Sequence, residues 1–162
     1  MTRTGSGEAT QSKMDPPNKP VEMKVVATGD AGSLRYELQP VGGYEHFLEG
    51  QTVKLPKGPD WYEINFHLVD NSSLKLEFDQ KEPICAQVGS GCPAPGSGNQ
   101  SERQLEQKGV GAKRLVMVNV NTDPPRKIAY TLCFIDAATQ EPVTPFDPIM
   151  DNGGGGRIPS YW

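Results

Sequence analysis

The sequence predicts an all-β protein, a two-layer antiparallel β-sandwich of about 7–9 short strands on Ig-like or Greek-key lines. From Pro20 onward, apolar and polar residues alternate with the period of two that is typical of half-buried strands. Glycine and proline make up about a fifth of the 162 residues, which suits short strands joined by many turns. No segment shows a clear amphipathic helix pattern. A closed barrel is the alternative architecture, because closure also removes exposed strand edges.

The domain is expected to lie between two segments of different composition. Residues 1–19 are polar, rich in Gly, Ser and Thr, and include Pro16 and Pro17, so they predict a disordered arm. The β-sandwich domain is expected over residues 20–152. Four consecutive glycines begin at Gly153, and residues 153–162 are interpreted as a flexible C-terminal tail.

Two hairpins are predicted in the first half of the domain. Residues 21–28 and 33–41 alternate on either side of the turn sequence Gly-Asp-Ala-Gly. Residues 51–56 predict a short edge-like strand that Pro56 ends. Residues 61–70 place Tyr, Ile, Phe and Leu on one face and Glu, Asn and His on the other, and Asp-Asn-Ser-Ser then predicts a tight turn into residues 74–78.

The second half contains a turn-rich insertion and a further predicted hairpin. Residues 79–112 hold at most one short strand, at 84–88, and residues 101–107 could form a helical turn capped by a serine. The alternating residues 113–121 and 127–136 predict a hairpin across Thr-Asp-Pro-Pro-Arg.

The last predicted strand covers residues 142–150. Its three prolines indicate an edge position, with Phe146 and Ile149 packing inward, and Asn152 with Gly153 would supply the positive φ angles that end the strand. The expected core residues are Val25, Tyr36, Leu38, Ile64, Phe66, Leu68, Leu76, Phe78, Val116, Val118, Tyr130, Leu132 and Phe134.

Composition argues against several classes of function. The formal net charge is -4, so a nucleic-acid partner is not expected. No apolar run is long enough to span a membrane, and the first residues lack the apolar core of a secretory signal. A cytoplasmic location is the default expectation.

The Asp-Asn-Gly sequence near the end raises the question of a bound cation. Asp147, Asp151 and Asn152 offer hard oxygen ligands, and Asp136 could reach them from a neighbouring turn. A calcium-type site at these four residues is kept as an alternative, although their spacing matches no known calcium loop. Strand termination is the preferred interpretation, and no cofactor is predicted.

The cysteines give little support for catalysis. Cys85 and Cys92 are separated by six residues in a glycine-rich loop, which is too wide for a zinc knuckle but permits a disulfide. Neither they nor Cys133 has a histidine in a recognisable catalytic arrangement. A cysteine-dependent enzyme or redox protein therefore remains only an alternative, and the chain is predicted not to be an enzyme.

Several features of the chain together resemble a known group of proteins. They are the segment YEINFHLVDNSSLKLEF, the loop PICAQVGSGCP, the strands KRLVMVNVN and IAYTLCFID, and the ending FDPIMDNGGGG. This order is similar to that of uncharacterised small bacterial proteins that finish in an Asp-Pro-Ile-x-x-Asn-Gly-Gly type motif. The resemblance covers roughly residues 20–156. It implies a β-sandwich and no assigned activity.

The remaining candidates are surfaces for a protein partner. Tyr44 and Phe47 lie in a loop that follows two glycines, and the last residues end in Tyr161 and Trp162. Aromatic residues and arginine commonly anchor protein interfaces. The sequence therefore predicts a non-enzymatic protein-binding module, or an accessory or structural subunit of a larger assembly, with contacts at Tyr44, Phe47, Arg157, Ile158, Tyr161 and Trp162.

Overall fold

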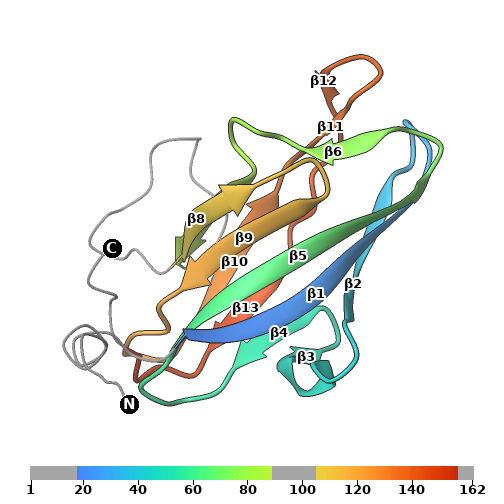
Figure 1. The fold of residues 1–162 in the computed structure, drawn as a ribbon. Helices are drawn as coiled ribbons and strands as arrows, with labels where there is room; N and C mark the ends of the chain where they lie inside the picture. The colour runs from blue at the N-terminus through green and yellow to red at the C-terminus, as the bar shows by residue number, and fades with distance from the viewer. Residues whose placement is uncertain (1–17, 89–104, 157–162) are drawn as a thin grey trace, which may run out of the picture.

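The computed structural model describes residues 18–88 and 105–156, and within these ranges it is all-β (Figure 1). The strands form two five-stranded sheets and one three-stranded sheet, with a short 3-10 turn at Glu45–Phe47. The predicted fold class is confirmed at this level. The number of strands exceeds the prediction because the chain forms short strands, such as Leu48–Glu49 and Glu141–Pro142, that alternation cannot reveal.

Sheet A has the strand order β2-β1-β5-β9-β8. Its strands are β1 (Asn18–Gly29), β2 (Arg35–Pro40), β5 (Trp61–Ser72), β8 (Leu105–Val110) and β9 (Arg114–Asn119). The predicted hairpin of β1 and β2 is confirmed, with Val25 opposite Leu38. Residues 105–107, part of the segment considered for a helical turn, lie in β8 instead, where they pair with β9.

Sheet B has the strand order β3-β4-β13-β10-β7. Its strands are β3 (Leu48–Glu49), β4 (Thr52–Leu55), β7 (Ile84–Val88), β10 (Arg126–Leu132) and β13 (Ile149–Asn152). Sheet C has the order β12-β11-β6, from β6 (Leu76–Phe78), β11 (Phe134–Asp136) and β12 (Glu141–Pro142).

Sheets A and B are mixed, which corrects the prediction of antiparallel sheets, whereas sheet C is antiparallel. β1 runs parallel to β5 over its whole length, from Asn18 opposite Trp61 to Gly29 opposite Ser72. β13 runs parallel to β4, and the remaining ladders are antiparallel. Parallel neighbours need a long connection between them, and alternation along one strand carries no information about such distant pairing.

Two predicted hairpins are wrong. β5 is followed by the expected turn, but β6 then pairs with β11 in sheet C. β9 and β10 lie in different sheets, because β9 pairs with β5 and β8 while β10 pairs with β13 and β7. β5, β9 and β10 each have a neighbour on both edges, so none has an edge left for the next strand in sequence. A turn signal therefore predicted the reversal of the chain but not its pairing.

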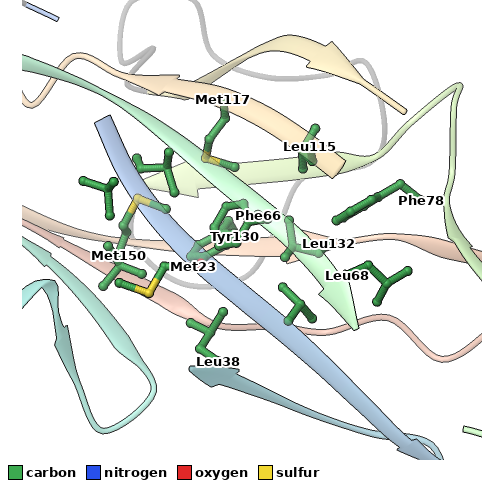
Figure 2. Packing of buried hydrophobic residues seen from close by; sticks show 14 of the residues in the cluster. Met23, Leu38, Phe66, Leu68, Phe78, Leu115, Met117, Tyr130, Leu132 and Met150 are labelled. Carbon is green, nitrogen blue, oxygen red and sulfur yellow. The ribbon is translucent and has the colours of Figure 1, made fainter. Parts of the chain in front are cut away.

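The main hydrophobic core is one cluster to which side chains from sheets A and B both contribute (Figure 2). The rings of Phe66 from β5 and Tyr130 from β10 lie with centroids 6.1 Å apart. Phe134 of sheet C joins the same cluster and contacts Phe78, at a centroid distance of 4.8 Å. Most of the predicted core residues are buried here.

β9 faces the core with the opposite side from the one predicted. Leu115 and Met117 are fully buried in the main core, whereas Val116 is half-buried outside it. Val118 belongs to a separate small cluster with Trp61 and Val120. Both sets of alternating residues on β9 are apolar, so the sequence did not distinguish the two faces.

The last strand also differs from its prediction. β13 lies between β4 and β10 and is therefore not an edge strand. The three prolines do not prevent this pairing, because the last of them, Pro148, lies just before the first residue of the strand. Phe146 packs against the core as expected, but Ile149 points outward and is 42% exposed. No helix in the described ranges is long and apolar enough to cross a membrane.

Tyr36 connects β2 to the segment that leads into β13. Its ring stacks on Phe134 and Phe146, at centroid distances of 5.1 and 5.4 Å, and its hydroxyl donates to the Thr144 carbonyl over 2.5 Å. Burial, aided by the charge of Asp70, raises the pKa of Tyr36 to about 12. The phenol therefore stays a proton donor throughout the neutral range.

The turn after β5 follows the predicted side-chain chemistry. One carboxylate oxygen of Asp70 accepts hydrogen bonds from the Ser72 N–H and hydroxyl, and the other accepts one from the Leu76 N–H. Partial burial raises the pKa of Asp70, but these hydrogen bonds and the charge of Lys113 outweigh it, and the pKa lies below its usual value of 3.8. The charged carboxylate is thus the form that the fold prefers.

Replacing Asp70 with Asn is expected to destabilise the protein more at pH 7 than at pH 3. A carboxyl group whose pKa is lowered by folding contributes stability above its unfolded pKa, and this contribution is lost as the pH falls through the folded pKa. Because the group is partly exposed, we expect a loss of up to about 1 kcal/mol at pH 7. Urea unfolding of both proteins at the two pH values measures this, and an equal difference at pH 3 and pH 7 would contradict it.

Candidate functional site

Three buried asparagines and the four consecutive glycines meet where β9 and β13 end. We call the group formed by Asn119, Asn121, Asn152 and Gly153–Gly156 the Asn–Gly junction. Its three asparagine side chains are fully buried. Buried polar groups of this kind are costly unless they are hydrogen-bonded, so their partners show what holds the junction together.

Two of these asparagines form a reciprocal amide pair. Asn119 Nδ2 donates to Asn152 Oδ1 over 2.8 Å, and Asn152 Nδ2 donates to Asn119 Oδ1 over 2.8 Å. Asn119 Oδ1 also accepts the N–H of Asn121 over 2.9 Å, and Asn119 Nδ2 contacts Met150 Sδ at 3.0 Å. The pair therefore connects the end of β9 in sheet A to the end of β13 in sheet B.

The third asparagine holds two loops together. Asn121 Nδ2 donates to the carbonyl of Pro56 over 3.0 Å, and Asn121 Oδ1 accepts the N–H of Gly154 over 2.9 Å. Its backbone has a φ of 52°, a conformation that asparagine tolerates better than most residues. The Gly156 N–H donates to the Asn121 carbonyl over 2.6 Å, so Asn121 contacts the glycine segment at both Gly154 and Gly156.

Lack of space or a positive φ angle favours glycine at each of the four positions. A Cβ atom on Gly153 would lie 2.4 Å from the Lys57 nitrogen, and one on Gly156 would lie 2.0 Å from the Val120 carbonyl oxygen. Gly154 and Gly155 both have a φ of 87°. The pair of positive φ angles thus falls two residues later than predicted, at Gly154 and Gly155 instead of Asn152 and Gly153.

The junction packs residues that the sequence assigned to the tail. Gly153 donates to the Leu55 carbonyl over 2.8 Å, and the Gly58 N–H donates to the Gly154 carbonyl over 3.0 Å. The packed chain therefore runs to Gly156, four residues beyond the predicted domain end. At the other end, β1 begins at Asn18, two residues before the predicted start.

The residues considered for a cation are used for other contacts. Asp136 lies in sheet C, where its Oδ1 accepts the N–H groups of Lys75 and Ala138. Asp147 Oδ1 accepts the Thr131 hydroxyl over 2.6 Å, Asp151 lies opposite Lys54 and Lys127 in sheet B, and Asn152 is in the amide pair. Within residues 18–88 and 105–156, no three His, Cys, Asp or Glu side chains are grouped so that they could hold a metal ion.

The two aromatic residues of the loop predicted to contact a partner pack against other residues of the protein. Tyr44 is half-buried and precedes the 3-10 turn, with its ring 6.3 Å from that of Phe47. Phe47 packs against the core and meets the ring of Tyr62 edge-on, with centroids 6.1 Å apart. Phe47 therefore contributes to the packing of the core. The sequence could not show which of the two aromatic residues, Tyr44 or Phe47, packs inward.

Several predicted residues fall outside what the structure describes. Cys92 and the tail residues Arg157, Ile158, Tyr161 and Trp162 lie outside the described ranges. Cys85 lies in β7, where it pairs with Thr131 in the ladder to β10. The proposed disulfide of Cys85 and Cys92 thus stays a prediction.

A second polar group lies on the outer face of sheet A, which faces away from the core. We call it the outer polar network. Glu22 accepts a hydrogen bond from Asn65 Nδ2 over 2.9 Å and contacts His67 Nε2 at 2.7 Å. Asn65 Oδ1 accepts a hydrogen bond from the Arg114 guanidinium over 2.7 Å. The sequence showed that Asn65 and His67 share a face of β5, but not that β1 and β9 would bring Glu22 and Arg114 to it.

Comparison with known proteins adds no assignment. No protein-family model matches the sequence, and no curated protein matches it either. The similarity to small bacterial proteins that end in an Asp-Pro-Ile-x-x-Asn-Gly-Gly type motif therefore stays a prediction.

Proposed function

We propose that this protein is a non-enzymatic protein-binding module, an accessory or structural subunit of a larger assembly, and that residues 157–162 contact its partner. The observation that carries the proposal is the Asn–Gly junction. It ends at Gly156, whose N–H is bonded to Asn121 and which forms a bridge with Thr122. The tail therefore begins at a defined point on the domain.

The chemistry of the junction supports a mechanical role. Its polar groups are neutral amides and backbone groups that bond to one another, and the glycines bring three segments of backbone into close contact. Such an arrangement orients a chain and offers no nucleophile or general base. The residues that follow include Arg157, Tyr161 and Trp162, which are residue types that dominate binding energy at protein interfaces.

We also infer that sheets A and B are the two layers of a β-sandwich, because the core cluster contains side chains from both sheets. In such a fold the loops gather at the two ends of the sheets. The junction lies at one of these ends, between the loop after β4 and the loop after β9.

The test compares the full chain with a variant in which residues 157–162 are replaced by six Gly and Ser residues. In lysate of cells that naturally make the protein, we expect the full chain to sediment in a larger complex and the variant as the chain alone. A photo-reactive amino acid at position 161 should cross-link one defined protein. Thermal unfolding serves as the control, because the replacement leaves the junction up to Gly156 unchanged and should not shift the midpoint. Unchanged sedimentation of the variant would contradict the proposal.

A further inference from the structure

The outer face of sheet A contains a line of three basic side chains on adjacent strands. Lys24 of β1 lies opposite His67 of β5, and His67 lies opposite Arg114 of β9. We call these three residues the basic row. Neighbouring strands are about 4.8 Å apart, so the row extends over roughly 10 Å. Lys24 and Arg114 are exposed, and His67 is half-buried.

The two ends of the row, Lys24 and Arg114, carry charges of the same sign. Glu22 contacts the centre of the row, at a distance of 2.7 Å from His67 Nε2. Within the described part of the chain, neither Lys24 nor Arg114 forms an ion pair.

The outer polar network also holds the guanidinium of Arg114 in place. Asn65 is only 6% exposed and is held by Glu22, so its Oδ1 gives the guanidinium a fixed partner. The amide is neutral, so the charge of Arg114 is oriented without being compensated. A planar guanidinium oriented in this way matches a carboxylate, with which it can form two parallel hydrogen bonds.

We propose that the basic row binds an acidic polypeptide segment of a partner protein, in which two carboxylates meet Lys24 and Arg114. In an extended chain, a distance of roughly 10 Å corresponds to carboxylates two to four residues apart. Glu22 and Glu37 lie in the neighbouring rows of the same face, so a broad polyanion such as a nucleic acid would meet carboxylates on both sides. This inference rests on the proposed protein-binding function but uses a surface separate from the tail.

The experiment measures binding of a fluorescent ten-residue peptide with alternating Glu and Ser, by anisotropy at low ionic strength. The full chain should bind it and should not bind the same peptide with Gln in place of Glu. Lys24→Gln and Arg114→Gln should each weaken binding about two- to fivefold, and the double variant by about tenfold, as expected for exposed ion pairs. Lys127→Gln, which removes an exposed charge from sheet B, is the matched control and should bind like the full chain.

Three results would overturn the inference. They are unchanged binding by the double variant, equal weakening by Lys127→Gln, and tighter binding of a ten-residue oligothymidylate than of the acidic peptide. The variant with the replaced tail separates the two proposals. It should bind the peptide like the full chain, and loss of peptide binding there would assign the site to the tail and not to the basic row.

Discussion

Replacing Asn119 with alanine is expected to lower the free energy of unfolding by about 3 kcal/mol, because the change leaves buried polar groups without partners. Asn119 makes both hydrogen bonds of the amide pair with Asn152 and accepts the N–H of Asn121. All three residues are fully buried, so water cannot replace these bonds without opening the junction. Urea unfolding followed by circular dichroism measures the change.

A double-mutant cycle tests whether the two amides act as a pair. Asn152→Ala should cost about as much as Asn119→Ala, but the double variant should cost less than the sum by about 1–2 kcal/mol. The loss of the first amide already removes the partner of the second. Asn71→Ala, at an exposed asparagine near the end of β5, is the control and should change stability by less than about 0.5 kcal/mol. Additive costs of the two single variants would show that the amides do not interact.

Replacing Gly153 with alanine is expected to cost about 2–4 kcal/mol, since the new methyl group has no space. It would lie 2.4 Å from the nitrogen of Lys57 and 2.7 Å from the carbonyl carbon of Pro56, both of which are backbone atoms. Gly153 does not have a positive φ, so this substitution tests whether a side chain fits at this position and not whether its backbone conformation is tolerated. Thermal unfolding should show a lower midpoint.

Gly42→Ala is the matched control for this prediction. A Cβ at Gly42 meets no atom within 4 Å, and its φ is not positive. This change should be neutral or slightly stabilising, because alanine restricts the unfolded chain. If Gly153→Ala is as stable as Gly42→Ala, the glycines of the junction are not required by space.

Features that depend on residues close together in the chain could be predicted from the sequence. Alternation correctly predicted an all-β chain, the hairpin of β1 and β2, and the inward face of β5. The Asp70 turn was also predictable, because aspartate and serine side chains bond to backbone groups only a few residues away. Each of these features arises within a short stretch of chain, where the sequence limits the possible conformations.

Which strands are neighbours, and therefore which residues meet, became clear only from the folded chain. β1 and β5 run parallel, so Glu22 contacts His67 and Asn65 over more than forty residues of sequence. The glycine run correctly indicated unusual backbone, but it did not reveal the close contacts of Gly153–Gly156, because glycine occurs both in flexible chain and in close packing. The glycines pack against Asn121, which Asn119 holds at the end of the distant strand β9. Contact between such distant segments depends on the packing of the whole core and not on the local sequence pattern.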